Sequence, residues 1–543
     1  MARQLIVLSG AIGSGKSTLA QRLAERYGAS LITTREIVAE RMTPGGRREG
    51  LSRERLQRRG QRLDTELGGA WLVEGVSGRV EGLGELVVID SARTTAQVES
   101  LREAFPRVTH VHLKASLGTL EARYRSRESV KGFTEAASYD IARSNRTERG
   151  IDQLETDADI CIDTDTSDAE MVLVRAATRL GLLSAYSDRL VDVLVGGQYG
   201  SEGKGNISAY LSSEYELLVR SGGPNAGHTV PLTTGSHVQH HLPSGARRSE
   251  AKLLLAPGAV VNVRNLLKEI SESQVDSDRL KIDPQAMVIT DEHIAEEQRL
   301  VEEIGSTGQG VGAASAARIW RKLDTVLAKD VPELKPYLAD SHEILERAFA
   351  AGHRVFVEGT QGTGLSLLHG RYPHVTSRDT TVSGLLAEAG IPPSRVRRTI
   401  MVCRTYPIRV KDPDTEGKTS GYIFHETSWE EVSQRSGLDL EELKKQELTS
   451  TTRKQRRVGE FDWTLLQRAA QLNGPTDIAL TFVDQLSSKN IDARRYDQLA
   501  DETIRFIEEV EGVAQAPVSL ISTRFHVRSI IDRRTWVGAD ARV

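Results

Sequence analysis

A glycine-rich turn near residue 200 carries a single lysine between a strand-like run and a helical pattern. Residues 191–211 read VDVLVGGQYGSEGKGNISAYL. Glycines at this spacing let consecutive backbone N–H groups face an anion, and the following helix offers its positive N-terminal end. Lys204 would bring a mobile charge to the outer phosphates. The stretch therefore predicts a nucleotide or phosphorylated intermediate held by Gly200, Gly203 and Gly205.

A second loop of this kind opens the chain. The run LIVLSGAIGSGKSTLA places a complete P-loop between a predicted strand and an amphipathic helix. The backbone amides of such a loop cradle the α and β phosphates, Lys16 reaches the β and γ phosphates, and Ser17 can hold Mg²⁺. The alternative is a degenerate loop kept only as scaffold. We predict a working nucleotide site made by Gly10, Gly13, Gly15, Lys16, Ser17 and Thr18.

The residues after the first P-loop have the order of a small kinase. Arg35 and the arginine-rich stretch 41–62 lie where nucleoside monophosphate kinases keep their acceptor-binding helices. A later helix carries Arg123, Arg125 and Arg127. The order resembles adenylate-kinase-like and dephospho-CoA-kinase-like enzymes, in which lid arginines neutralise charge on the transferring phosphoryl group. We expect these arginines to act as a set, because one arginine alone is more often a solvated helix face.

Strand and helix patterns divide the chain into two domains. In the first, candidate strands are 71–76, 85–93, 108–116 and 158–165, and a closing helix is 171–183. The small, polar segment 184–188 predicts the boundary, so that residues 1–187 form a P-loop nucleotide (monophosphate) kinase-like domain and 188–543 a larger one. In the larger part, apolar strand candidates alternate with helical stretches. The expected fold class is α/β, with two P-loop-type domains whose mainly parallel sheets are flanked by helices.

Composition excludes several classes of function. Of 543 residues, 38% are hydrophobic and 27% charged, which is typical of globular proteins. No apolar run approaches the roughly 20 residues that span a bilayer, so we expect a cytoplasmic protein without membrane contact. The net charge of −4 gives no general reason to bind nucleic acid. With only Cys161 and Cys403, a structural disulfide or zinc site is not expected.

Ordered motifs in the larger part carry a family resemblance. GQYGSEGKGN is followed by GGPNAGHT, and then by HHLPSG, GSTGQGVG, EGTQGTGLS, YPHVTSRDTT, TSTTRKQRRVGEFDW and ISTR. From about Val191 to the C-terminus this order resembles adenylosuccinate synthetases. The short length and the runs RTYPIRV and RRVGEFDW look more like archaeal and phage forms, including the branch that makes a 2-amino-2′-deoxyadenylosuccinate, than like the long bacterial enzyme.

The resemblance implies a ligase that joins L-aspartate to C6 of a 6-oxopurine nucleotide. A nucleoside triphosphate first phosphorylates the C6 oxygen, and the aspartate amine then displaces phosphate. On this basis His228 would hydrogen-bond the transferring phosphoryl group, and Gln361 would orient the O6 region of the purine. Lys204 would bind the donor phosphates, and the Gly227 carbonyl would bind Mg²⁺.

The same resemblance implies the binding residues for each ligand. Asn225, Thr307 and Thr376 match the pocket for the 5′-phosphate and ribose of the substrate. Arg321 matches an arginine that reaches the 5′-phosphate of a neighbouring subunit, which implies a homodimer. The aspartate carboxylates would be held by Thr451, Thr452 and Lys454, and the donor ribose by Arg456. Lysine lacks the bidentate fork of the family's arginine, so aspartate affinity is expected to differ.

Ser201 stands where the family has a catalytic aspartate. That aspartate removes the N1 proton of the purine and binds Mg²⁺, and a serine hydroxyl has far too high a pKa to take the proton unaided. Serine is smaller and uncharged, however, and leaves room for a 2-amino group whose hydrogen bond it can accept. The acceptor therefore stays open between IMP and GMP or dGMP, with Ser201 favouring a 2-amino purine.

The donor pocket also departs from the family. The chain has Thr-Phe-Val-Asp at 481–484 and Ser-Thr-Arg-Phe at 522–525 where the family has Thr-Lys-Leu-Asp and Ser-Thr-Gly-Pro. Asp484 can still accept from guanine N1 and N2, but the lysine stem and the Gly-Pro turn are lost. GTP and ATP or dATP both remain as candidate donors.

Three functions remain open from the sequence. The favoured one is a bifunctional purine enzyme in which the ligase is fused to a nucleotide kinase. The second is a working kinase joined to a synthetase-like module that only binds nucleotide or dimerises. The third is a different ligase that acts on a modified nucleotide. The acceptor of the kinase is not predicted by any motif.

Overall fold

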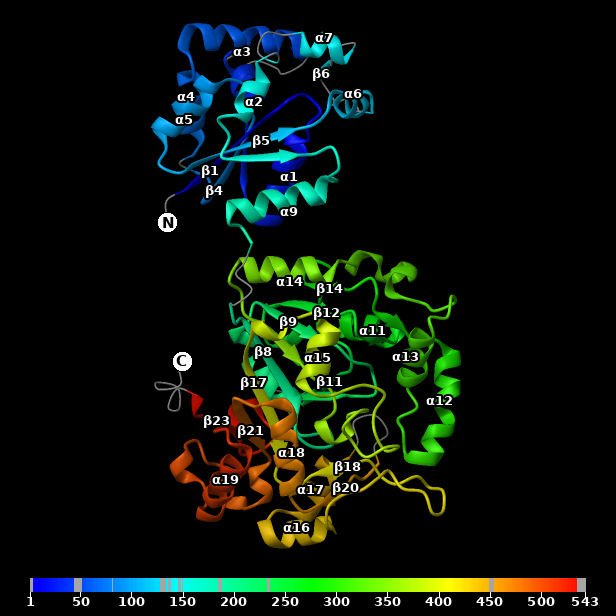
Figure 1. Cartoon of the computed structure of the whole chain (residues 1–543). Coiled ribbons are helices and arrows are strands. Elements are labelled where there is room, and N and C mark those ends of the chain that lie inside the picture. The colour runs from blue at the N-terminus through cyan, green and yellow to red at the C-terminus, as the bar shows by residue number, and fades with distance from the viewer. Residues whose placement is uncertain are drawn as a thin grey trace. The chain divides into compact units, whose positions relative to one another are not determined.

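The first P-loop follows the central strand of a parallel sheet. In the computed structural model, residues 3–42, 51–80, 82–126, 133–134, 138–144, 148, 150–183, 188–231, 235–448 and 454–534 are described. The chain divides into two units, Met1–Ser184 and Ala185–Val543, which are coloured blue to cyan and green to red (Figure 1). The α/β class with two mainly parallel sheets, expected from the sequence, is confirmed.

The first unit is built on a five-stranded sheet in the order β2-β4-β1-β5-β7 with all neighbours parallel. Helices cover the sheet, and the central strand β1 and the middle residues of β4 and β5 are buried, which explains their apolar runs. The strands are β1 (Gln4–Gly10), β2 (Ser30–Thr33), β4 (Leu86–Asp90), β5 (Val108–Lys114) and β7 (Ile160–Asp163), and β3 (Leu51–Ser52) pairs separately with β6 (Phe133–Thr134).

Helices of the first unit follow these strands in the order expected of crossover connections. The principal ones are α1 (Lys16–Tyr27), α2 (Thr34–Glu40), α3 (Arg53–Leu67), α4 (Ala70–Val80), α5 (Thr95–Ala104), α6 (Leu117–Arg125), α7 (Tyr139–Arg143) and α9 (Ala169–Leu180). The arginine-rich stretch thus contributes α3, and Arg123 and Arg125 lie at the end of α6. Arg127 lies outside the described residues.

The strand predicted at 71–76 is wrong, because these residues belong to α4. Trp71, Leu72 and Val76 are buried on one face of this helix. A Cβ on Gly75 would lie 2.5 Å from Ile37 of α2, so glycine allows the two helices to approach closely. A six-residue apolar run does not distinguish a strand from a buried helix face, and packing decides between them.

The second unit contains a nine-stranded sheet in the order β14-β12-β9-β16-β8-β17-β21-β22-β23. Only β23 runs antiparallel to its neighbour. The strands are β8 (Val191–Gly196), β9 (Leu217–Arg220), β12 (Lys252–Leu255), β14 (Leu280–Ile282), β16 (Val355–Glu358), β17 (Val396–Arg404), β21 (Asp477–Thr481), β22 (Val518–Ser522) and β23 (Ile530–Asp532).

Helices and three small sheets surround this sheet (Figure 1). The helices are α10 (Lys204–Leu211), α11 (Val263–Ser273), α12 (Asp291–Ile304), α13 (Val311–Trp320), α14 (Ser341–Ala350), α15 (Val382–Ala389), α16 (Trp429–Ser436), α17 (Leu440–Gln446), α18 (Trp463–Asn473) and α19 (Asp501–Ala514). The small sheets pair β10 (His228–Pro231) with β11 (Ser236–Gln239), β13 (Val260–Val261) with β15 (Met287–Val288), and β20 (Arg457–Gly459) with β18 (Ile408–Arg409) and β19 (Glu426–Thr427).

The topology brings the motif loops to one edge of the large sheet. β9, β16, β8, β17 and β21 are consecutive parallel neighbours, so their carboxyl ends lie side by side. The loops that follow them contain most of the residues for which the sequence predicts chemistry. Ligands of open parallel sheets bind at this edge. Within the described residues, no helix is both long enough and apolar enough to pass through a membrane.

Candidate active site

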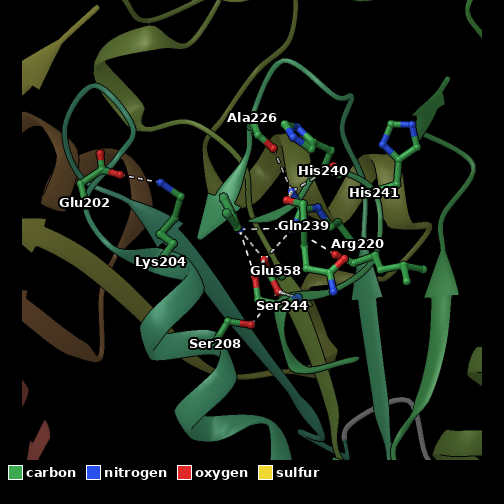
Figure 2. Close-up of polar contacts among 12 residues, drawn as sticks. Glu202, Lys204, Ser208, Arg220, Ala226, Gln239, His240, His241, Ser244 and Glu358 are labelled. Carbon is green, nitrogen blue, oxygen red and sulfur yellow. Dashed lines mark hydrogen bonds and ion pairs between the residues drawn. The ribbon is translucent and has the colours of Figure 1, made fainter. Parts of the chain in front are cut away.

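The loop between β8 and α10 encloses a carboxylate as well as a lysine. Glu202 is fully buried and accepts hydrogen bonds from the backbone N–H groups of Gln198 (3.1 Å) and Gly200 (2.8 Å). Its second oxygen accepts from Nζ of Lys204 at 2.5 Å, as Figure 2 shows. Two of the amides in the predicted phosphate cradle are therefore bound by a side chain of the same loop. Sequence reasoning missed Glu202. The Glu-x-Lys spacing could have predicted it, because a buried pair of this kind satisfies both charges locally.

Backbone conformation explains the glycines of this loop. Gly200 and Gly203 have φ angles of 85° and 84°, which glycine adopts without strain. A Cβ on Gly205 would lie 3.1 Å from Cβ of His228, and a Cβ on Gly200 would lie 3.3 Å from Cα of Gln361. Glycine at these positions thus lets the loop pack directly against the segments that carry the predicted catalytic histidine and glutamine.

Glu358, at the end of β16, organises a buried polar cluster around His228. Its Oε1 accepts from Nδ1 of His228 at 2.5 Å and from Nη1 of Arg220 at 2.8 Å. Hydroxyl groups of Ser208 and Ser244 donate to the same carboxylate at 2.6 and 2.5 Å (Figure 2). Sequence reasoning missed Glu358 and Arg220. They end β9 and β16 in the structure, and their place near the ends of two apolar strand candidates was the available signal.

The cluster fixes the protonation of the histidine. Burial, followed by the nearby Arg220 charge, lowers the pKa of His228 to about 4, so the imidazole is neutral near pH 7. Burial opposes ionisation of Glu358, but Arg220 and the hydrogen bonds from His228 and Ser208 outweigh it and hold the pKa of that carboxyl at about 2. With Nδ1–H donating to a permanent carboxylate, Nε2 of His228 is left as the proton-accepting nitrogen.

The structure brings Lys204, His228 and Gln361 around one loop. The Lys204 charge acts on His228, and the backbones of both His228 and Gln361 pack against loop glycines. Gln361 has a φ angle of 51°, and its buried Oε1 has no hydrogen-bond partner among the described residues. Buried polar atoms rarely stay unpaired, so this oxygen marks a place where a ligand can bind. Ser201, with φ of 56°, lies on the same loop.

Three loops that the sequence assigned to the substrate phosphate converge. Nδ2 of Asn225 donates to Oγ1 of Thr376 at 3.4 Å, and Oδ1 of Asn225 is buried without a described partner. A Cβ on Gly223 would meet Val311, and one on Gly312 would meet Ser377. The start of α13, just after the loop of Thr307, therefore packs against both of the other segments. Gly227 lies between Asn225 and β10 in the same arrangement.

Other predicted residues lie at the margin of this site or outside the description. Arg321 directly follows α13, with an exposed side chain and a φ angle of 54°. Thr451 and Thr452 fall outside the described residues. Lys454, on the same segment, contacts Asp414 at 3.3 Å through Nζ.

The predicted donor side is a second buried charge cluster. Glu447, directly after α17, pairs with Arg404 at 2.7 Å and with Arg456 at 3.4 Å. Nη1 of Arg404 also donates to the Ser201 carbonyl at 3.3 Å, which ties the cluster to the loop. Asp484 is buried beside it, and its Oδ1 has no partner among the described residues.

The first unit carries its own phosphate-type site. Gly10 has φ of 136°, and a Cβ there would lie 2.1 Å from the Leu113 carbonyl, so only glycine fits. Nζ of Lys16 donates to the Gly10 and Ala11 carbonyls at 2.7 and 2.8 Å. Gly13 and Gly15 also have positive φ angles, and Thr18 is exposed on α1.

The two units differ in how well they suit Mg²⁺. In the first, Oγ of Ser17 donates to Oδ2 of Asp90 at 2.6 Å, which places a hydroxyl and a carboxylate together as Mg²⁺ prefers. In the second, the implied donors are the Gly227 carbonyl and the neutral Ser201 hydroxyl, and the Glu202 carboxylate is already paired. Mg²⁺ in the second unit would depend on oxygens of its substrates.

Sequence comparison identifies relatives for both units. The adenylosuccinate synthetase family model matches residues 193–331 and 322–492, and a model of an AAA domain matches residues 6–148. The adenylosuccinate synthetase of Methanocaldococcus jannaschii is 38% identical over 351 residues, which is 63% of this chain and 96% of that protein. The Pyrococcus horikoshii synthetase is 38% identical and covers 64% of this chain and 99% of its own length.

Two solved structures resemble the chain over a similar share of its length. The succinoaminodeoxyadenylate synthetase of cyanophage S-2L, bound to dGMP and to dATP as an energy donor, is 29% identical, with a TM-score of 0.54. It covers 64% of this chain and 96% of its own. The adenylosuccinate synthetase of Plasmodium falciparum has a TM-score of 0.55 at 20% identity, and it covers 63% of this chain and 99% of its own. The latter supports only the fold.

Proposed function

The chain belongs to the adenylosuccinate synthetase family, and on that premise we propose that its ligase unit joins L-aspartate to C6 of GMP or dGMP. The observation that carries the proposal is the loop around which Lys204, His228 and Gln361 gather, with Ser201 on it. The cyanophage relative bound to dGMP supports a 2-amino purine. The second candidate is IMP, which the similarity to archaeal adenylosuccinate synthetases favours.

The geometry of His228 fits it to the phosphoryl-transfer step. A phosphoryl group beside Nε2 favours the protonated imidazole, and the Glu358 carboxylate stabilises that cation from the opposite nitrogen. The protonated Nε2 then donates a hydrogen bond to the transferring group, and Lys204 neutralises donor phosphates once it leaves Glu202. Mg²⁺ would supply further charge neutralisation between the phosphates. Gln361 offers its unpaired side chain to the purine O6 region.

One assay distinguishes three outcomes: ligation of a 2-amino purine nucleotide, ligation of IMP, and no ligase activity. Purified full-length protein is incubated with L-aspartate, Mg²⁺, and each of IMP, GMP and dGMP, using GTP, ATP or dATP as donor. We expect a succinylated nucleotide with GMP or dGMP, detected by mass. An adduct only with IMP would favour the second candidate, and no adduct with any 6-oxopurine would contradict the ligase proposal.

For the first unit we propose a nucleotide kinase that uses ATP and Mg²⁺. The Ser17–Asp90 contact and the complete P-loop support it, as does the match of residues 6–148 to an AAA domain. Its acceptor is proposed to be a purine nucleoside monophosphate of the pathway that the ligase serves.

Lys16→Ala is expected to lower phosphate transfer from ATP to a panel of nucleoside monophosphates by at least about 10²-fold, because the lysine charge on the outer phosphates is lost. The ligase rate of the same protein should stay within about twofold, since the two loops lie in separate units. Coupled assays of both reactions on one preparation measure this. Equal loss of both activities would contradict independent sites.

We propose that the ligase unit acts as a homodimer through the end of α13. Ile319 and Trp320 are 75% and 77% exposed, although large apolar side chains are usually buried, and Arg321 follows them directly. A partner subunit that covers these side chains would place Arg321 at a neighbouring site.

Trp320→Glu is expected to weaken the dimer by at least about 30-fold, because buried tryptophans dominate interfaces and a charge cannot be desolvated there. Sedimentation of full-length protein across a concentration series measures this, and ligase activity should fall with dimer content. Met171→Glu, at an exposed apolar residue of α9 in the first unit, is the matched control. A wild-type monomer that is fully active would contradict the proposal.

A further inference from the structure

The proposed ligase reaction needs a proton acceptor that neither Ser201 nor Glu358 provides. The purine must lose its N1 proton before O6 is phosphorylated, and a serine hydroxyl is too weak a base to take it. Burial works against ionisation of Glu358, yet Arg220 and His228 hold its pKa at about 2, so this carboxylate stays paired. The base must therefore be another group beside the loop between β8 and α10.

The carboxylate of Glu202 has the position for this role. Its side chain is fully buried, and a Cβ on Gly362 would overlap its Oε1, so the carboxylate packs against the segment that carries Gln361. Oε1 of Gln361, which lacks a hydrogen-bond partner among the described residues, is proposed to face the purine O6. N1 adjoins C6 in the purine ring. Ser201, which stands where the related synthetases keep their N1 base, directly precedes Glu202.

The two carboxylate oxygens of Glu202 have different partners. Oε1 accepts from the backbone N–H groups of Gln198 and Gly200 at 3.1 and 2.8 Å, which fix the direction of the carboxylate. Oε2 accepts only from Nζ of Lys204 at 2.5 Å among the described residues (Figure 2). Lys204 is also the residue proposed to move onto the donor phosphates. Binding of the donor thus releases Oε2, while the two amides keep Oε1 in place.

The main chain around this carboxylate is fixed by other contacts. Oγ1 of Thr481 donates to the Glu202 carbonyl at 2.6 Å, and Nη1 of Arg404 donates to the Ser201 carbonyl at 3.3 Å. The side chain can therefore exchange its partner without movement of the loop. A carboxylate that is buried without a cation takes up a proton more readily than a paired one, so the departure of Lys204 prepares the base.

We propose that Glu202 is the catalytic base of the ligase reaction, and that its pairing with Lys204 keeps it inactive until the donor binds. Oε2 takes the N1 proton, and the electron pair of the N–H bond passes through the ring to O6, which attacks the γ-phosphorus. The O6–P bond forms while the bond to the β-phosphate oxygen breaks, and the nucleoside diphosphate is the leaving group. When the aspartate amine then attacks C6, the C6–O6 bond breaks, the proton on Oε2 goes to the departing phosphate, and the surplus proton of the amine goes to solvent.

The inference rests on the proposed ligase function, and a double-mutant cycle with Ser201→Asp tests it separately. Full-length proteins carrying Lys16→Ala are used, so that the kinase unit does not consume the nucleotides, and each is assayed with the acceptor it prefers. Glu202→Gln keeps an acceptor for the two amides but cannot take a proton. Its turnover number should fall by at least about 10²-fold, whereas the affinity for the purine nucleotide, measured by calorimetry, should change less than about threefold.

Ser201→Asp supplies a base of its own, so Glu202→Gln should lower the turnover number of that variant less than about fivefold. A purely structural role of Glu202 would make the two losses equal. Equal losses, or a turnover number of Glu202→Gln within threefold of its parent, would therefore overturn the inference. The exposed Glu296→Gln of α12 is the matched control and should behave as its parent.

A second variant covers the case in which Glu202→Gln is poorly folded. Glu202→Asp keeps a carboxylate on a shorter stem, and its turnover number should exceed that of Glu202→Gln by at least about tenfold. Thermal unfolding of both variants shows how much folded protein each rate refers to. The reverse order of rates per folded protein would contradict the inference. If the parent protein forms no succinylated nucleotide from any 6-oxopurine, the proposed ligase function is contradicted instead.

Discussion

His228→Ala is expected to lower the turnover number of the ligase reaction by about 10²- to 10³-fold, with little change in the affinity for the purine nucleotide. The imidazole contributes to the transition state, where phosphoryl charge develops, more than to the ground state. Nδ1 is already engaged by Glu358 at 2.5 Å, so only Nε2 faces the reaction. Steady-state kinetics with the active acceptor measure the effect.

Two controls distinguish loss of a catalytic group from loss of folding. His353→Ala removes an exposed histidine outside the cluster and should leave the rate unchanged. Thermal unfolding of His228→Ala should remain cooperative, because the Arg220–Glu358 pair is retained. By contrast, Glu358→Ala would leave the buried Arg220 charge unpaired, which costs about 3–5 kcal/mol of stability. A turnover number within threefold of wild type in His228→Ala would refute the role given to this residue.

The buried pair of Glu358 and Arg220 could not be predicted from the sequence. The glycine loops, His228 and Gln361 were found because their types and spacing form motifs. Glu358 and Arg220 are 138 residues apart, and each is merely the last residue of an apolar strand until the sheet order makes β9 and β16 neighbours. Charge compensation of this kind depends on tertiary contacts, which no local pattern contains.

In the loop of Glu202, the sequence likewise predicted the loop but not its hydrogen bonds. The sequence predicted that amides around Gly200 face a phosphate, and the structure shows the amides of Gln198 and Gly200 bound to Glu202. Local spacing identified the loop but not which acceptor its donors choose. The segment 71–76 was misassigned for a related reason, because the helical packing of Gly75 on Ile37 decides its conformation.

Ser201 connects the loop geometry to the choice of acceptor. Its φ angle of 56° lies in the left-handed region, which aspartate and asparagine adopt more readily than most residues. A substitution there by either residue is therefore compatible with the backbone. Arg404 bonds the Ser201 carbonyl, so the main chain of the loop is held independently of its side chain.

Ser201→Asp is expected to shift the ratio of kcat/KM for IMP over dGMP by at least about 10²-fold toward IMP. A carboxylate at this position supplies a base for the N1 proton, which alone is worth about 10²- to 10⁴-fold, and it occupies the room that serine leaves for a 2-amino group. Ser201→Asn has the same shape without the base. It should lose dGMP activity without gaining IMP activity, and this difference separates proton removal from steric exclusion. Competition of the two acceptors in one reaction, followed by mass detection of both products, measures the ratio. If the preference is the same in all three proteins, Ser201 does not select the acceptor, and the proposal of a 2-amino purine loses its physical basis.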